Sequence, residues 1–181
     1  MKIDSRPTQW IGAALILGGA AFFALGLPRI AAAFPTETAT EAGRALTVGG
    51  IAITPSDGWT APKDAQKILV LRKAGAQITG IPPVLAAGDA KTILTSVVDP
   101  MRQDKETAWQ FSEPQAFTTA SGASGAYVVA QAPQQFLTNF VVVQDGRSTQ
   151  VIVSGTDADW TSLHDEILDM IKTVEIPAGA P

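Results

Sequence analysis

The sequence contains no cysteine and a single histidine, His164, among its 181 residues. The lack of cysteine excludes disulfides, thiol nucleophiles and zinc sites built from thiolates. Charged residues make up only 17% of the chain, and the formal net charge is -4. Nucleic-acid binding needs clustered lysine and arginine, so this charge balance argues against it. A chain of this length has room for one ordinary domain and an appendage.

One apolar run near the N-terminus explains the low charge content. Residues 10–27 read WIGAALILGGAAFFALGL and contain no charged side chain. As a helix this run rises about 27 Å, close to the roughly 30 Å hydrocarbon core of a bilayer. Trp10 at one end and Arg29 just beyond the other suit the two membrane interfaces. We therefore predict a single transmembrane helix over residues 10–27.

The fate of this segment is open between an uncleaved anchor and a cleaved signal peptide. Ala31 and Ala33 satisfy the small-x-small pattern of a signal-peptidase site, which places cleavage before Phe34. Signal peptides usually have apolar cores of about 7–15 residues, so the greater length of this run favours the anchor. Either fate exports the C-terminal part, and Lys2 and Arg6 ahead of the helix are consistent with a cytoplasmic N-terminus.

The chain is accordingly divided into five parts. We predict a protein of the cell membrane with one span, its N-terminus inside and its folded domain extracytoplasmic. The parts are a cytoplasmic N-terminus, a transmembrane helix, a linker, an extracytoplasmic domain and a tail, over residues 1–9, 10–27, 28–44, 45–176 and 177–181.

The apolar helix carries a stripe of glycine. Gly12, Gly19 and Gly26 recur every seven residues and so lie along one slowly drifting line on the helix. Small residues let helix backbones approach closely in lipid, where there is no hydrophobic drive to bring helices together. The stripe predicts an interface with a partner helix, and so with other membrane proteins. The alternative is that glycine is simply common in transmembrane helices.

Strand and helix patterns follow in an order typical of an α+β domain. Asp145 and Gly146 join the last two strands as a hairpin. One helix follows Asp89, and a longer helix with an apolar face begins after Asp157 or Asp159. We predict an antiparallel sheet with helices packed on its faces. The expected strands, from alternating or continuous apolar runs between turn signals, are residues 45–54, 68–71, 77–81, 108–112, 117–120, 126–132, 136–144 and 148–154.

Proline is expected to delimit some of these elements. Pro82 and Pro83 stop the strand over residues 77–81, because proline cannot donate to a ladder. Pro100 complicates the first helix, and it is equally suited to be the first residue of a second short helix. A last short strand is expected over residues 174–176.

Two motifs resemble a known fold. Pro55, Gly58 and Trp59 form a Pro-x-x-Gly-Trp turn after the first strand, and residues 145–147 (DGR) join two apolar strands before the final helix. With the helix and the strand meander between them, these motifs resemble the PsbP-like fold, and the exported actinobacterial LpqN lipoproteins are a second comparison. The resemblance covers most of residues 45–176. It implies α/β/α layers and a non-catalytic attachment to a larger membrane assembly. LpqN-type proteins carry lipid on a cysteine, which this chain lacks, and a protein helix would replace that lipid.

The sequence contains few residues or motifs suited to catalysis or to binding a cofactor. It contains no phosphate-binding loop, GxSxG elbow, HExxH motif or dinucleotide fingerprint. His164 lies at the border of an apolar helix face, where a histidine is usually structural or solvated. The acidic residues near the last helix lack the spacing of a calcium loop and are expected to cap the helix and form its solvated face. We predict no enzyme, no catalytic residue, no metal and no cofactor. The acidic residues near the last helix, which are expected to cap it or to form its solvated face, are Asp157, Asp159, Asp165, Glu166 and Asp169.

An apolar segment stiffened by two prolines is the candidate contact surface of the domain. It is expected to be a loop, which either lies exposed as a docking patch or covers one edge of the sheet. Trp59, Trp109, Tyr127 and Trp160 suit core packing better than a ligand pocket. The docking residues are Ile81, Pro82, Pro83, Val84 and Leu85.

These observations favour a non-catalytic, membrane-anchored accessory or structural subunit of a larger bacterial envelope membrane-protein complex. The apolar anchor, the glycine stripe and the absence of catalytic motifs support this function. The alternative is a membrane-tethered ligand-binding or scaffolding module outside the cytoplasm, exported and cleaved or not. The identity of a partner or ligand is not encoded in any of these patterns.

Overall fold

The computed structural model describes residues 37–63, 67–103 and 108–178. Within these ranges, no helix has the length and apolar character needed to cross a membrane. The transmembrane helix predicted over residues 10–27 lies outside the described residues, as does the cleavage site predicted after Ala33.

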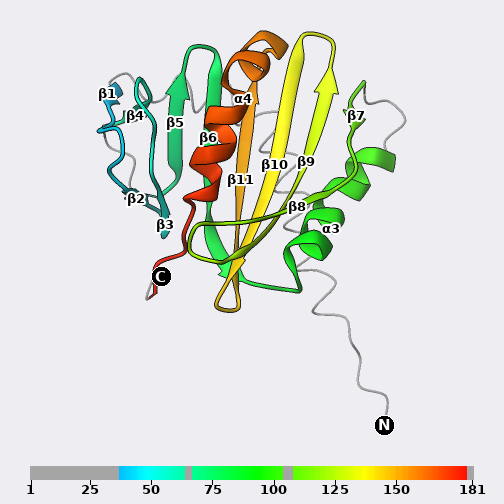
Figure 1. The fold of residues 1–181 in the computed structure, drawn as a ribbon. Coiled ribbons are helices and arrows are strands. Elements are labelled where there is room, and N and C mark those ends of the chain that lie inside the picture. The colour runs from blue at the N-terminus through cyan, green and yellow to red at the C-terminus, as the bar shows by residue number, and fades with distance from the viewer. Residues whose placement is uncertain (1–36, 64–66, 104–107, 179–181) are drawn as a thin grey trace. The chain divides into compact units, whose positions relative to one another are not determined.

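The described residues form one large antiparallel sheet, one small hairpin and two helices (Figure 1). The hairpin consists of β2 (Leu46–Val48) and β3 (Ile51–Ile53). The helices are α3 (Ala90–Gln103) and α4 (Asp157–Lys172). The strands of the large sheet, in spatial order, are β1 (Glu37–Ala39), β4 (Thr60–Pro62), β5 (Leu69–Lys73), β6 (Ala76–Leu85), β11 (Arg147–Gly155), β10 (Gln135–Gln144), β9 (Ser124–Ala132) and β7 (Gln110–Phe111), with β8 (Gln115–Thr118) also paired to β9.

The β10–β11 hairpin lies at the centre of the sheet. The two strands pair along their whole length, and the turn residues Asp145 and Gly146 have φ angles of 51° and 73°. Positive φ at both positions is what a two-residue turn needs if its twist is to match that of the strands. Phe140 and Val141 point to opposite faces and are both buried. The predicted central hairpin, covered on both faces, is confirmed.

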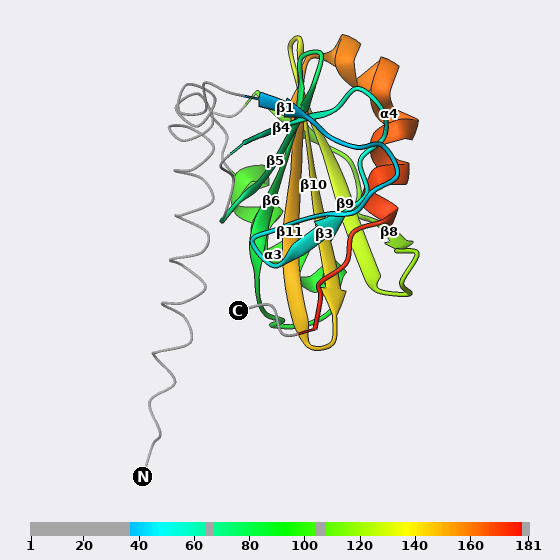
Figure 2. The same cartoon turned by 90° about the vertical axis from the view of Figure 1, so that its left-hand side faces the viewer.

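The two helices cover opposite faces of the sheet. Val141 of β10 packs into a cluster with Leu94 of α3. Its neighbour Phe140 belongs to the larger cluster on the other face, together with Ile167 of α4. Figure 2 shows the sheet close to edge-on, with α4 on one side and α3 on the other. The predicted α/β/α layering is therefore confirmed for the described domain.

Both helices begin at a side chain that satisfies backbone N–H groups. Asp89 accepts a hydrogen bond from the Thr92 N–H at 2.7 Å, as the sequence predicts for the start of α3. α3 then continues through Pro100, so the second short helix is not formed. The cap of α4 is Thr156, which forms a reciprocal capping box with Asp159. The sequence prediction missed this threonine because two further cap candidates, Asp157 and Asp159, follow within three residues.

The strand β6 is longer than predicted. The two prolines do not end it, and it continues to pair with β11 as far as Leu85. On its other side, β5 pairs with β6 only as far as Gly80. Among the described strands, residues 81–85 therefore have a partner on one edge only. Successive N–H groups of a strand point to opposite edges, so one of the two prolines faces the unpaired edge, where a missing N–H breaks no ladder. The other lies at the irregularity in the β6–β11 pairing between Ser148 and Gln150, and so neither Pro82 nor Pro83 stops the strand.

Three short elements at the rim of the domain depart from the sequence expectations. β1 and β4 pair with each other, although neither was predicted. β1 lies within residues 28–44, which the sequence assigned to the linker, so the sheet already includes Glu37. Residues 174–176 form no extended strand; Glu175 makes an isolated antiparallel bridge with Ala52.

Candidate functional site

The end of β6 exposes apolar side chains. We refer to residues 82–87 as the β6 tip. Leu85 is 84% exposed and Val84 is 48% exposed, whereas Pro83 is buried and Ile81 is half-buried. The predicted docking residues therefore lie in a strand and not in a loop, but three of the five are exposed. An exposed pair of large aliphatic side chains at the end of a strand is a candidate contact point.

Hydrogen bonds hold the backbone of this tip in place. The Ala86 N–H donates to the Gly146 carbonyl at 2.8 Å, which joins the tip to the β10–β11 turn. The Thr149 hydroxyl donates to the Ile81 carbonyl at 2.6 Å, at an irregularity in the β6–β11 pairing. Arg147 donates to the Pro83 carbonyl at 3.3 Å. The exposed side chains therefore stand on a fixed backbone.

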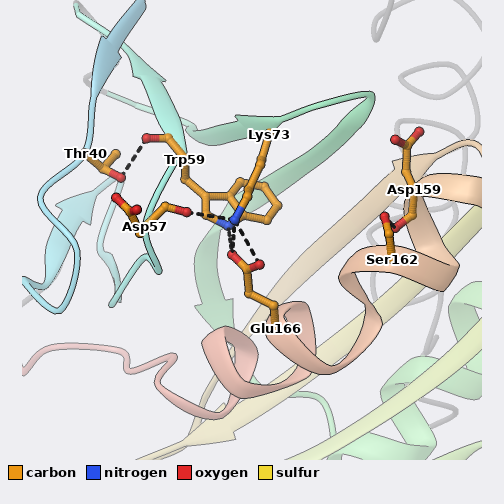
Figure 3. A network of polar contacts seen from close by, with 7 residues as sticks. All are labelled: Thr40, Asp57, Trp59, Lys73, Asp159, Ser162 and Glu166. Carbon is orange, nitrogen blue, oxygen red and sulfur yellow. Dashed lines mark hydrogen bonds and ion pairs between the residues drawn. The ribbon is translucent and has the colours of Figure 1, made fainter.

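A buried tryptophan and an ion pair fasten α4 to the sheet, and we call Trp59, Lys73 and Glu166 the α4 clamp (Figure 3). Trp59 is fully buried and donates its indole N–H to Glu166 Oε1 at 2.6 Å. Lys73 Nζ donates to both carboxylate oxygens of Glu166, at 2.8 and 2.9 Å, and to the Asp57 carbonyl at 2.8 Å. The expectation that Glu166 belongs to a solvated face is thus wrong. Lys73 and Trp59 engage its carboxylate oxygens and so position Glu166 against the sheet.

The first turn of α4 makes a second attachment to the sheet. Asp159 accepts from the Gly75 N–H at 3.2 Å, in the turn between β5 and β6. It also accepts from the Thr156 N–H at 3.0 Å and from the Thr156 hydroxyl at 2.6 Å. The hydroxyl of Thr156, its N–H and the Gly75 N–H together lower the pKa of Asp159. One carboxylate therefore caps α4 and ties it to the β5–β6 hairpin.

A third feature is a polar row on the face of the sheet that α3 packs against. Gln150 belongs to this row and pairs with Val141, whose side chain packs against α3, so the row lies on that face. Arg72 donates to Gln77 at 3.0 Å through Nε and to Glu37 at 2.5 Å through Nη1, while its buried Nη2 finds no acceptor among the described residues. The Thr60 hydroxyl and then Arg72 lower the pKa of Glu37. The polar row consists of Glu37, Arg72, Gln77, Thr79, Gln150 and Asn139.

The only histidine has ordinary surroundings. His164 Nδ1 lies 2.9 Å from Asp165, whose side chain is 99% exposed, and its ring packs edge-on against Trp160. Within the described ranges, no group of three or more histidine and acidic side chains is arranged to hold a metal ion. Trp160 in turn packs against Phe136. These contacts are those of a structural histidine and a core aromatic.

The sequence indicated the apolar segment at the β6 tip, where docking stays a prediction, but it did not indicate the α4 clamp or the polar row. The tip was visible as a local apolar segment with two prolines. The clamp joins side chains that are 93 and 107 positions apart in the chain, and no local pattern connects them. The stripe of Gly12, Gly19 and Gly26 lies outside the described residues and stays a prediction.

The fold defines a three-layer α+β domain, and comparisons with known proteins identify similar structures. No protein-family model matches the chain, and no curated protein sequence matches it. LpqN of Mycobacterium tuberculosis, described as involved in cell envelope biogenesis, is 16% identical with a TM-score of 0.52, over 78% of this chain and 91% of LpqN. The predicted resemblance to LpqN is therefore confirmed for the fold.

Two further structures match over the same share of this chain. The cyanobacterial PsbP of Synechocystis sp. PCC 6803 is 12% identical with a TM-score of 0.46, over 78% of this chain and 92% of PsbP. A Mog1 variant is 11% identical with a TM-score of 0.49, over 78% of this chain and 96% of Mog1. PsbP is thus among the proteins of similar structure.

Proposed function

We propose that this protein is a non-catalytic accessory subunit of a bacterial envelope membrane-protein complex. Residues 10–27 anchor it in the membrane, and the folded domain lies outside the cytoplasm. The observation that carries the proposal is the combination of a long uncharged N-terminal run with a domain of the LpqN fold. LpqN is described as involved in cell envelope biogenesis, and we extend that setting to this chain.

The described side chains support a role in assembly over one in catalysis. The carboxylates of Glu166 and Asp159 both accept hydrogen bonds that hold α4 against the sheet. The exposed apolar groups are concentrated at Val84 and Leu85, on a backbone that hydrogen bonds keep in place. Adjacent exposed aliphatic side chains on a fixed support form a small apolar patch of the kind that can mark a protein contact site. Residues 81–85 and the glycine stripe are the two contacts that we propose.

Purification from the native membrane in a mild detergent tests this function. A full-length chain with a C-terminal tag is expected to retain other membrane proteins in stoichiometric amounts. Replacing Gly12, Gly19 and Gly26 by leucine should release them, because larger side chains keep helix backbones apart. Ala21→Leu is the matched control, since Ala21 is about 200° around the helix from Gly19 at 100° per residue. Recovery of the wild-type chain alone would contradict the accessory function.

The polar row favours one alternative, a ligand-binding module tethered outside the cytoplasm. Arg72 offers a nitrogen that has no acceptor within residues 37–63, 67–103 and 108–178, and Gln150 and Asn139 add amide groups on the same face. A buried donor that lacks a partner costs free energy, which a ligand oxygen would offset. Under this alternative the purified chain is monomeric and carries a small molecule that native mass spectrometry detects. Arg72→Gln should then lose that molecule, whereas Lys91→Gln, at an exposed lysine of α3, should keep it.

A further inference from the structure

The first described strand, β1, lies at an edge of the large sheet and is held there by few contacts (Figure 1). All three of its residues are exposed, and among the described strands it pairs with β4 alone. The register that joins β4 to β5 contains one residue pair, Thr60 with Arg72. Just after β1, the N–H and the hydroxyl of Thr40 both donate to the Trp59 carbonyl at 2.9 Å. The charged contact of β1 is made by Glu37.

Glu37 meets the guanidinium of Arg72 at one of its two terminal nitrogens. Nη1 donates to Glu37 Oε1 at 2.5 Å, and Nε donates to Gln77 Oε1 at 3.0 Å. Nη2 is buried and has no acceptor among the residues that the structure describes. The other carboxylate oxygen of Glu37 accepts from the Thr60 hydroxyl at 2.7 Å. The ion pair therefore uses one terminal nitrogen, although arginine and a carboxylate frequently form two parallel hydrogen bonds.

The unused nitrogen makes Glu37 replaceable. A carboxylate that is free of β1 can accept from Nη1 and Nη2 together, and it then satisfies a buried donor that Glu37 leaves unpaired. The side chain of Arg72 is only 17% exposed, so its charge is costly without an anion beside it. One positive charge balances one carboxylate. The neighbouring cation, Lys73, is paired with Glu166, so a phosphate dianion would be balanced only in part.

We propose that Arg72 is a carboxylate-binding site which Glu37 occupies in the ligand-free protein, and that a carboxylate ligand displaces Glu37 and releases β1 from β4. The ligand carries its carboxylate on an aliphatic stem, as Glu37 does. Its source is a small organic acid or a glutamate of an extended peptide that pairs with β4 in place of β1. The inference specifies the ligand chemistry of the polar row. It uses residues of the folded domain alone, so it does not depend on the accessory function.

Amide hydrogen exchange of the full-length protein tests the release of β1. One probe is sodium propionate, which reproduces the glutamate side chain, and the other is a capped peptide with the sequence of residues 37–40 (ETAT). Sodium chloride at the same ionic strength is the reference. A probe that displaces Glu37 is expected to raise the exchange rate of residues 38–40 about threefold or more, while β10 stays protected. Arg72→Lys keeps the charge but not the two-pronged geometry, and should abolish the response.

A second measurement follows binding in a variant that lacks the competing carboxylate. Glu37→Gln should tighten the binding of isotope-labelled propionate about tenfold in an NMR titration, because the site is then free in a larger fraction of molecules. Glu41→Gln is the matched control. It removes the same charge from a pair with Arg44 in which the two side chains are 71% and 74% exposed, and it should leave the affinity unchanged.

Three results would overturn the inference. The first is equal exchange of residues 38–40 in the wild type with propionate, the peptide and chloride, and this measurement needs no substitution. The second is unchanged propionate binding in Glu37→Gln, and the third is a full response in Arg72→Lys. A response to propionate identifies a free acid as sufficient, whereas a response to the peptide alone identifies a paired strand as the source. The accessory function fails separately, if the wild-type chain retains no membrane protein on purification.

Discussion

Trp59 shows what a single buried polar atom requires of its surroundings. Its indole N–H has one acceptor, Glu166, and the ring around it is fully buried. Glu166→Ala leaves that N–H unpaired and is expected to lower the free energy of unfolding by about 2 kcal/mol. Glu166→Gln keeps an acceptor and should cost less. Urea unfolding of the full-length protein, followed by tryptophan fluorescence, measures both changes.

The matched control for this prediction is on the same helix. Asp165 is the preceding residue in sequence but its side chain is 99% exposed, so Asp165→Ala should change the unfolding midpoint little. Equal losses for the alanine variants at positions 165 and 166 would mean that helix propensity, and not the clamp, explains the result.

Gly125 depends on the aromatic ring across from it. A Cβ at this position would lie 2.4 Å from the ring of Phe117, its cross-strand partner. Gly125→Ala should therefore destabilise the protein by about 1–2 kcal/mol through overpacking. In a Phe117→Ala background the same change should cost less, and a coupling of at least about 0.5 kcal/mol is expected in the double-mutant cycle. Additive effects would show that the ring moves aside freely.

At the scale of elements, α4 is attached at its start by a titrating group. The pKa of Asp159 is lowered below its ordinary value of 3.8, with the Thr156 hydroxyl as the largest cause. A lowered pKa in the folded state means that the carboxylate contributes stability above about pH 3.8, and that this contribution is lost as the pH falls through the folded value. Asp159→Asn should therefore flatten the decline in stability between about pH 5 and pH 3.

Urea unfolding at the two pH values checks this prediction. Thr156→Val removes the hydroxyl and should flatten the decline in part. A remaining slope is expected because the pKa of Glu37 is lowered as well. An Asp159→Asn variant with the slope of the wild type would contradict the assignment.

Local signals explain which elements the sequence predicts well. The β10–β11 hairpin is specified by its Asp145-Gly146 turn, and α3 by Asp89 and the apolar spacing that follows. Both elements depend on residues that are close to each other in the sequence. The short strands β1 and β4 have no apolar pattern of their own. Their extended structure depends on pairing with each other in the folded domain. The full length of β6 was missed since the effect of a proline depends on whether its edge is paired, which only the sheet decides.

The same distinction applies to the candidate sites. The β6 tip is contiguous in sequence, so its apolar character was visible, although its strand geometry was not. The α4 clamp brings together a residue from each of three distant segments, Trp59, Lys73 and Glu166. Glu166 is on the polar side of an amphipathic helix, where sequence alone predicts a solvated carboxylate. Its contacts with Trp59 and Lys73 become known only from the folded structure.

At the scale of the whole molecule, the prolines of β6 protect an open edge of the sheet. Residues 81–85 have no described partner on one side, and unpaired strand edges are templates for association. Replacing Pro82 and Pro83 together by threonine restores backbone N–H groups and is expected to cause self-association. Sedimentation velocity measures it, with Pro55→Thr, outside the sheet, as the control. A double variant that sediments like the wild type would show that the prolines do not guard this edge.

The way in which the chain enters its domain determines its response to force. β1 is held to β4 by the three residue pairs from Glu37 to Ala39, and the ion pair of Glu37 with Arg72 lies at the first of them. A pull applied at Glu37 at right angles to β1 loads these contacts one after another, before it loads the central hairpin. The strand β1 would therefore separate from β4 at low force and add its residues to the linker, while the core and the β6 tip keep their structure.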